Sequence, residues 1–429
     1  MKTYKTLLLF TLSFFYFSLF SQDTYKNLQA SLKSSVVKLQ SSNIETSVIR
    51  FSVDGYNTKS MQTTDGAEEI ISIEGGFPML IKGAPDMEKL MASLIIPDDA
   101  EMQVDIESST FTEYSNVAVA PSKGNLKRNI EPAGIPFEKG QEYVTNAFFP
   151  GKLAELGDPY VFRDYRGIPV YVYPYQYNPV TKTLRVYDEI IVKVSKKSND
   201  GANKLVRNKA FSKIDEEFSE IYPTHFVNFG SSKYTPLVER GKMLIVCYDS
   251  FMDAMQPFVD WKNTIGQPTE MVAVSTIGTT AASIKSYVAN YYNTNGLTFL
   301  LLVGDVDQIT TNTLTAGPSD NAYGYITGAD SYCEVIVGRF SAENVTHVNT
   351  QVDRTIEYEL NPSTSANWLN KGIGIGSDQG PGDDNEYDWQ HIRGLRTKLL
   401  NYEYSDIDEL YDGDQGGLDL PGSPTTANV

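Results

Sequence analysis

The side chains best suited to chemistry in this sequence are carboxylates that follow an apolar run. Residues Leu297–Val303 are mostly large and apolar, and Asp305 and Asp307 come shortly after Gly304. Such a run predicts a strand buried on both faces of a parallel sheet. Ligands of open α/β sheets bind beyond the carboxyl ends of their strands. The acidic pair therefore predicts a ligand site at that edge, although a solvated turn can carry the same pattern.

A second acidic segment, Ser377–Asp388, has the sequence SDQGPGDDNEYD and holds five carboxylates around two glycines. Together with the preceding GIGIG it has the glycine content of a phosphate-binding loop. Asp378, Asp383 and Asp384 would repel phosphate where backbone N–H groups should attract it. The segment therefore argues against a nucleotide-binding α/β protein.

Thiol chemistry has few candidates. Cys247 and Cys333 both lie in strand-like apolar runs, which predicts buried free thiols and excludes a disulfide framework. Cysteine catalysis needs a thiolate activated by an imidazole. Cys333 and His391 could form such a pair, but Cys333 is expected within a strand, where burial raises the pKa of a thiol. His225 and His347 are expected to be structural.

The elements that would position these groups change in kind along the chain. From residue 22 to 197, short strand-like runs alternate with Gly, Pro, Asn and Asp, which predicts a β-sandwich or barrel-like module. Its best hairpin spans Ile168–Val194 and turns at Asn178-Pro179, with alternation of period two in the second strand. Residues 198–208 are polar and aperiodic, which is typical of a linker.

After residue 233 strands and helices alternate, which predicts a parallel sheet covered on both faces. We expect strands at 243–248, 269–274, 297–305, 334–339 and 372–377. We expect helices at 251–262, 280–292, 342–360 and 385–400. Pro424 stands where another helix would begin, so the α/β domain is expected to be truncated.

Composition and charge narrow the functional classes. The 429 residues carry a net charge of −18, which disfavours nucleic acid as a partner. Lys2 and Lys5 precede an apolar run of residues 7–20, which is typical of a signal peptide cleaved near residue 21 and too short for a comfortable membrane span. No later segment reaches transmembrane length, so we expect a secreted or cell-surface protein.

Several long stretches resemble the gingipain-type cysteine peptidases, which are secreted, caspase-like bacterial endopeptidases. The resemblance is continuous from about Tyr234 to Val429, and the β-rich region is similar in placement to that family's inhibitory propeptide. The stretches are KMLIVCYDSFMDAMQPFVDWKNTIGQPTEM, LTFLLLVGD, SDNAYGYITGADSYCEVIVGRFSAE, QVDRTIEYE and EYDWQH.

The resemblance implies a domain order and a maturation bond. We expect a signal peptide at 1–21, a β-rich propeptide at 22–197, a linker at 198–233 and the N-terminal part of the peptidase domain at 234–429. Lys233–Tyr234 is the expected maturation bond, because the mature family members begin with Tyr-Thr-Pro after a basic residue. The family's catalytic His and Cys are expected beyond Val429, so this chain is expected to be inactive by itself.

The resemblance also implies a structural calcium site. Calcium prefers six to eight hard oxygen ligands from carboxylates and carbonyls, whereas magnesium retains its waters. The implied ligands, drawn from three segments that we expect to converge, are Asp305, Thr327, Asp330, Tyr332, Glu334, Glu386 and His391. Thr327 and Tyr332 would contribute backbone carbonyls.

The resemblance assigns the acidic loop to substrate specificity. Asp388 matches the aspartate that receives the substrate's arginine, and a carboxylate pairs best with the forked guanidinium. Arginine is therefore favoured before the cleaved bond, with lysine second, as Lys233 at the maturation site suggests. Gln379 or Asp378 stands where arginine-specific members carry the glutamate that orients the catalytic His. The neutral amide of Gln379 would support an imidazolium less well than a carboxylate.

Two functions remain open. The first is a secreted gingipain-type endopeptidase that acts on proteins or peptides after basic residues and is inhibited by its own propeptide. The alternative is a non-catalytic exported calcium-binding or adhesion protein derived from the same fold. Both predict calcium, so the downstream coding sequence is the observation that separates them.

Overall fold

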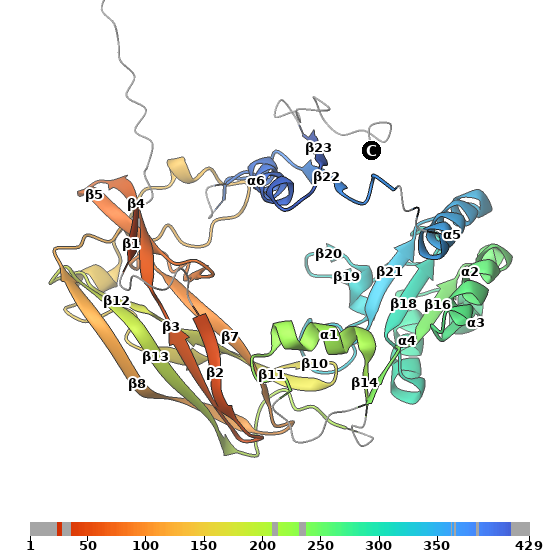
Figure 1. Ribbon diagram of the computed structural model, residues 1–429, viewed down its shortest axis with the longest axis horizontal. Coiled ribbons are helices and arrows are strands. Elements are labelled where there is room, and N and C mark those ends of the chain that lie inside the picture. Colours follow the sequence, from red (N-terminus) through yellow and green to blue (C-terminus); the bar gives the residue numbers. More distant parts are fainter. Residues whose placement is uncertain are drawn as a thin grey trace, which may run out of the picture.

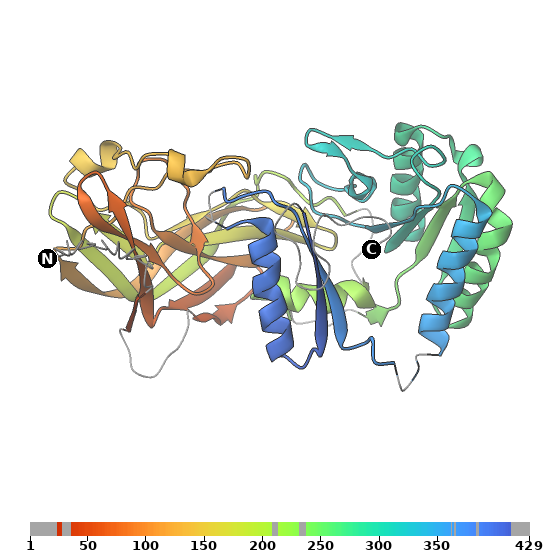
Figure 2. The ribbon, with the colours of Figure 1, turned by 90° about the horizontal axis from the view of Figure 1, so that it is seen from above.

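The protein has a β-rich half and an α/β half, and helix α6 (Asp388–Asn401) lies between them in both views (Figures 1 and 2). The computed structural model describes residues 24–27, 36–207, 213–230, 237–361, 363, 366–382 and 386–412. The predicted signal peptide and the bond Lys233–Tyr234 lie outside these ranges. Within them, each helix is too short or too polar to cross a membrane.

The β-rich half is a sandwich of two five-stranded antiparallel sheets, joined by a three-stranded sheet. The strand orders are β10-β11-β7-β6 with β9 on β11, β12-β13-β3-β2 with β8 on β13, and β1-β4-β5. The strands are β1 (Thr24–Asn27), β2 (Val36–Ser42), β3 (Thr46–Ser52), β4 (Gly55–Thr63), β5 (Gly66–Ser72), β6 (Phe77–Pro78), β7 (Glu88–Ile96), β8 (Glu101–Ser115), β9 (Ala154–Leu156), β10 (Tyr160–Phe162), β11 (Tyr165–Val172), β12 (Tyr175–Asn178) and β13 (Thr183–Ser198). Two short 3-10 turns, Pro132–Gly134 and Gln141–Val144, lie between β8 and β9.

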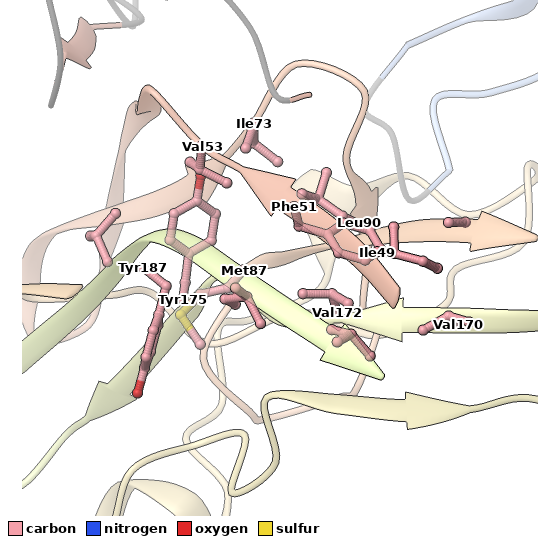
Figure 3. Close-up of a cluster of buried hydrophobic side chains, with 14 of the residues drawn as sticks. Ile49, Phe51, Val53, Ile73, Met87, Leu90, Val170, Val172, Tyr175 and Tyr187 are labelled. Atoms are coloured by element: carbon pink, nitrogen blue, oxygen red, sulfur yellow. The ribbon is translucent and has the colours of Figure 1, made fainter. Parts of the chain in front are cut away.

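One apolar core lies between the sheets of the sandwich. It joins side chains such as Phe51 of β3, Leu90 of β7 and Val172 of β11 (Figure 3). The expected alternation along β13 is confirmed, because Leu184, Val186, Ile190, Val192 and Val194 are all buried.

The expected hairpin at 168–194 is only partly right. β12 pairs with β13, but β11 belongs to the opposite sheet, where it pairs with β7. The run YVYPYQY therefore crosses between sheets at Pro174. A proline has no N–H to continue a ladder, which explains why the strand ends there.

The α/β half contains a four-stranded parallel sheet of order β17-β16-β18-β21. Its strands are β16 (Met243–Cys247), β17 (Thr269–Ala273), β18 (Phe299–Val303) and β21 (Ile336–Phe340). Helix α4 (Ala281–Asn295) packs on one face, and α2 (Met252–Thr264) and α5 (Val345–Leu360) pack on the other. Thr280 and Asn344 cap the starts of α4 and α5, since their side chains accept from Ser283 N and His347 N.

Several smaller elements connect the strands and helices of the α/β half. They are the 3-10 turns Asp249–Phe251 and Asp320–Tyr323, helix α3 (Val274–Ile277) and the two-stranded pair β19 (Thr313–Leu314) and β20 (Gly317–Pro318). The last elements are β22 (Lys371–Gly376), α6 (Asp388–Asn401) and β23 (Asp406–Tyr411), in which β22 and β23 pair in parallel. The expected order of a β-sandwich followed by a parallel α/β domain is confirmed.

The segment between the halves is ordered on both sides of the predicted maturation bond. Strand β14 (Lys213–Asp215) leads into helix α1 (Glu216–His225), and β15 (Leu237–Glu239) pairs in parallel with β14. The prediction that Cys333 lies within a strand is wrong. Strand β21 begins only at Ile336, and Cys333 lies in the preceding loop.

Candidate functional site

Asp388 lies in the first turn of α6 and is held there from two sides. The backbone N–H groups of Asp388 and Trp389 donate to the carbonyls of Gln379 (2.9 Å) and Ser377 (3.2 Å), which ties the acidic loop to the helix. The Ser377 hydroxyl donates to Asp388 Oδ2 (2.6 Å). That hydrogen bond, followed by the charge of Arg128, holds the pKa of Asp388 below its usual value of 3.8.

The partner of the Asp388 carboxylate comes from the β-sandwich. Arg128 Nη2 donates to Asp388 Oδ1, and the two side chains form an ion pair that spans 260 residues of sequence. The pair lies in a cavity of about 380 Å³, whose lining residues are Arg128, Ile375, Gly376, Ser377, Asp388, His391 and Ile392. In this arrangement a carboxylate, oriented by a serine hydroxyl, binds a guanidinium.

Gly382 lets the two halves approach closely at this point. Its φ of 52° is a left-handed conformation that glycine tolerates. A Cβ added there would lie 3.3 Å from Arg128 Cα, which is a tight contact. The Tyr387 hydroxyl also donates to Glu131 (3.4 Å), so residues around Arg128 lie directly against the acidic loop.

A second arginine of the β-sandwich enters the other half at a different place. Arg163 occupies the turn between β10 and β11 with φ of 50°. Its guanidinium donates to the carbonyls of Leu297 (2.6 Å) and Glu334 and to the Asp215 carboxylate, which also accepts from the Thr298 hydroxyl. The rings of Phe218 and Tyr292 flank this guanidinium.

The loop 326–334 next to Arg163 holds four of the predicted calcium ligands, Thr327, Asp330, Tyr332 and Glu334. Glu334 is fully buried, and its Oε2 accepts from the N–H groups of Ile326 (2.6 Å) and Thr327 (2.8 Å). Its Oε1 is also buried and has no hydrogen-bond partner among the described residues. Burial raises the pKa of Glu334 to about 7.

An orphaned carboxylate oxygen is what a hard cation would neutralise. Asp330 lies four residues earlier, and among the described residues its Oδ1 accepts only from Tyr332 N (3.0 Å). Thr327 and Tyr332 supply carbonyl groups in the same loop. The oxygen donors of this loop are therefore of the type that calcium prefers.

The remaining predicted ligands lie elsewhere. Asp305 follows the carboxyl end of β18 and accepts from the Ser341 hydroxyl (3.0 Å), whereas Glu334 precedes β21 at the amino end of the same sheet. At ~3.3 Å of rise per residue, opposite ends of these strands are roughly 20 Å apart. The structure therefore does not bring Asp305 together with Asp330 and Glu334, and its role as a calcium ligand stays a prediction.

Glu386 and His391 form a separate pair beside Asp388, with Oε2 and Nδ1 3.1 Å apart. Across the described part of the chain, no three His, Cys, Asp or Glu side chains are grouped as metal ligands. Gln379 directs its amide toward Asp378 (3.3 Å).

The cysteines and histidines do not form a dyad in the described ranges. Burial raises the pKa of Cys247 to about 12, and burial followed by the charge of Glu334 raises the pKa of Cys333. His225 contacts the Tyr160 hydroxyl (2.7 Å), and His347 contacts Asn344. His391 contacts Glu386, so the alternative pairing of Cys333 with His391 has no support in these contacts.

The sequence did not predict that the β-rich half contacts Asp388 and the loop 326–334. Arg128 follows Lys127 in SKGNLKRNIEPAGIP, so a basic pair within a Gly- and Pro-flanked segment was the available signal. Arg163 and Asn203, which touches the loop 326–334, had no comparable signal.

Comparison with known proteins identifies relatives for both halves. The family model Propeptide_C25 matches residues 27–229, and the model for peptidase family C25 matches residues 237–422. Gingipain R2 of Porphyromonas gingivalis is 39% identical over 386 residues, which cover 88% of this chain and 52% of that protein. Gingipain R1 of the same species is 39% identical over 382 residues, which cover 87% of this chain and 38% of that protein.

The chain thus spans about half, or less, of the length of these relatives. Among solved structures, the complex of the Porphyromonas gingivalis RgpB pro- and mature domains is 38% identical, with a TM-score of 0.42. That match covers 45% of this chain and 96% of the solved chain.

Proposed function

The chain belongs to the gingipain family, peptidase family C25, and we propose that it is part of the latent form of an exported cysteine endopeptidase that cleaves after basic residues, with arginine favoured. The single observation that carries this proposal is the Arg128–Asp388 ion pair. An arginine of the propeptide fills the place that a substrate arginine would take. The same contact therefore supports both the specificity and the inhibition.

The chemistry of the pocket favours arginine over lysine. Asp388 offers two carboxylate oxygens, one paired with Arg128 and the other with Ser377. A guanidinium keeps its charge at every physiological pH and donates from several N–H groups in one plane, whereas an ammonium is a point charge. Lysine would make the charge interaction but would fill less of the cavity.

The loop 326–334 supports structural calcium as a cofactor. Asp330 and Glu334 would supply carboxylate oxygens, and Thr327 and Tyr332 would supply carbonyls. Bound calcium would provide the positive charge that the buried Glu334 Oε1 lacks. Asp305, Glu386 and His391 stay ligand predictions that rest on family resemblance.

Neither cysteine of residues 1–429 is proposed as the nucleophile. Both thiols have raised pKa values, so neither is predisposed to form the reactive thiolate. We expect purified chain 1–429 to show no turnover of arginyl peptides, and Cys333→Ala to leave that result unchanged. Turnover that disappears in Cys333→Ala would overturn this assignment.

A binding experiment tests the specificity directly. Arg128→Ala should empty the pocket, so N-acetyl-arginine amide should bind this variant at least about tenfold more tightly than it binds the parent chain. N-acetyl-lysine amide should bind more weakly, and the neutral citrulline amide should not bind detectably. Isothermal titration calorimetry measures all three ligands.

Two controls make the experiment specific. Arg185→Ala removes another propeptide arginine, which pairs with Glu113 (2.8 Å) away from the pocket, and should behave as the parent chain does. Asp388→Asn in the Arg128→Ala background should abolish binding of the arginine amide. Equal binding of the arginine and citrulline amides would contradict the proposed specificity.

A further inference from the structure

The propeptide makes direct hydrogen bonds to the loop that fits calcium. The Val161 N–H and the Asn203 side-chain amide both donate to Asp330 Oδ2, each at 2.8 Å. Asn203 Oδ1 accepts from Ala329 N (2.9 Å), so this one side chain bridges two positions of the loop. We refer to Val161, Arg163 and Asn203 as the propeptide clamp.

Other contacts hold the clamp against the same loop. Arg163 donates to the Glu334 carbonyl, and the ring of Tyr160 stacks on that of Tyr332 with centroids 4.1 Å apart. Asn203 is held in turn, because its carbonyl accepts from the fully buried Arg166 (2.9 Å) and its amide also donates to Pro159 (3.1 Å). The clamp is therefore fixed from within the propeptide.

The hydrogen bonds of the loop divide its carboxylate oxygens into two kinds. Asp330 Oδ2 accepts two bonds from the clamp, and Glu334 Oε2 accepts two from the loop's own backbone. Asp330 Oδ1 accepts one, from Tyr332 N, and Glu334 Oε1 has no partner among the described residues. The clamp orients the Asp330 carboxylate by its other oxygen and leaves Oδ1 able to accept a further ligand.

We infer that the propeptide clamp and a calcium ion on the loop 326–334 stabilise each other, so that calcium strengthens the attachment of the propeptide. This inference rests on the calcium site of the proposed function. Groups that orient metal ligands typically change metal affinity by about 10- to 100-fold. Because coupling between two binding events is reciprocal, calcium must protect the clamp by the same factor.

The test uses the chain of residues 1–429 and calcium chloride alone. Asn203→Gly removes the bridging side chain but suits the backbone, since Asn203 has φ of 49°. Asn116→Gly is the matched control, because Asn116 is also a propeptide asparagine with positive φ (61°) and follows β8 rather than the clamp. Asp330→Asn identifies which calcium-binding transition belongs to this loop.

We expect Asn203→Gly to weaken the Asp330-dependent calcium binding at least about tenfold in calorimetry. Asn116→Gly should match the parent chain. Hydrogen–deuterium exchange gives an independent readout, since the Val161 N–H is itself part of the clamp. Calcium should slow its exchange in the parent chain and in Asn116→Gly, but not in Asp330→Asn.

Two results would overturn the inference while leaving the calcium site intact. One is equal calcium affinity of Asn203→Gly and the parent chain. The other is faster exchange of the Val161 N–H on adding calcium, which would mean that metal and clamp compete for Asp330. Absence of any Asp330-dependent calcium binding in the parent chain would instead remove the proposed metal site, and the inference with it.

Discussion

The propeptide reaches the peptidase half through two arginines in opposite environments. The side chains of Arg128 and its partner Asp388, on the peptidase half, are 39% and 37% exposed. Arg163 donates to the carbonyls of Leu297 and Glu334 on the peptidase half and pairs with Asp215 of the propeptide, and the side chains of this pair are only 6% and 12% exposed. Exposed ion pairs contribute little to stability, whereas breaking a buried pair leaves an uncompensated charge. The first contact is therefore suited to exchange with a substrate, and the second to permanent attachment.

This difference separates inhibition from anchoring. In the proposed function, the Arg128 contact blocks the specificity pocket. The Arg163 contact lies at the amino end of the central sheet, beside Leu297 and Glu334. Strands β14 and β15 pair on either side of the predicted maturation bond. A cut at Lys233–Tyr234 would leave both that pairing and the Arg163 contact in place, so latency should outlast this first cleavage.

The largest effect is expected from the buried arginine. Arg163→Met should lower the free energy of unfolding by about 3–5 kcal/mol, because Asp215 would lose its cation and two buried carbonyls would lose their donor. Urea unfolding followed by circular dichroism measures the change.

Arg185→Met is the matched control for the buried arginine. Arg185 also pairs with a carboxylate and stacks on an aromatic ring, that of Phe148, but its side chain is 29% exposed. We expect a loss below about 1 kcal/mol for this variant. Similar losses of unfolding free energy for Arg163→Met and Arg185→Met would contradict the assignment of Arg163 as the anchor of the propeptide.

An intermediate effect is expected from the hydroxyl that orients Asp388. In the Arg128→Ala background, Ser377→Ala should weaken binding of N-acetyl-arginine amide by about 1–1.5 kcal/mol, or roughly tenfold, through loss of one hydrogen bond to a charged group. The pKa of Asp388 should also rise toward its usual value, because the Ser377 hydroxyl is the main cause of its lowering.

Ser377→Thr separates this positioning role from a general loss of packing. Threonine keeps the hydroxyl, so affinity and the pH midpoint of ligand binding should both recover. If Ser377→Ala loses affinity but the pH midpoint of ligand binding does not change, Ser377 only supports the loop and does not set the pKa of Asp388.

Local sequence patterns predict much of the fold. The apolar run ending at Val303 correctly predicted a buried parallel strand, and the helix expected at 342–360 is found as α5, Val345–Leu360. The β-sandwich was predicted from alternation, but the crossing between sheets at Pro174 was not. Period-two patterning reports which face is buried, not which sheet buries it.

Contacts between distant residues explain the remaining errors. Family resemblance placed Asp305 and Glu334 in one set of calcium ligands, although Asp305 follows β18 and Glu334 precedes the neighbouring strand β21. Because β18 and β21 are parallel, these two residues lie at opposite ends of the strands. Arg128 and Arg163 meet partners more than a hundred residues away, and no local pattern encodes such pairs.

The smallest effect on stability is expected from the exposed arginine. Without ligand, Arg128→Ala should change the free energy of unfolding by less than about 1 kcal/mol, and added salt should shrink the difference further. The pKa of Asp388 is lowered in the folded chain, so its contribution is present above the usual value of 3.8 and is lost as pH falls through the lowered pKa. Between pH 5 and 8 the difference between Arg128→Ala and the parent chain should therefore stay constant, as urea unfolding at several pH values would show. A difference that grows near neutral pH would mean that Arg128 has a stronger, buried partner, and the propeptide would then be anchored at the pocket as well.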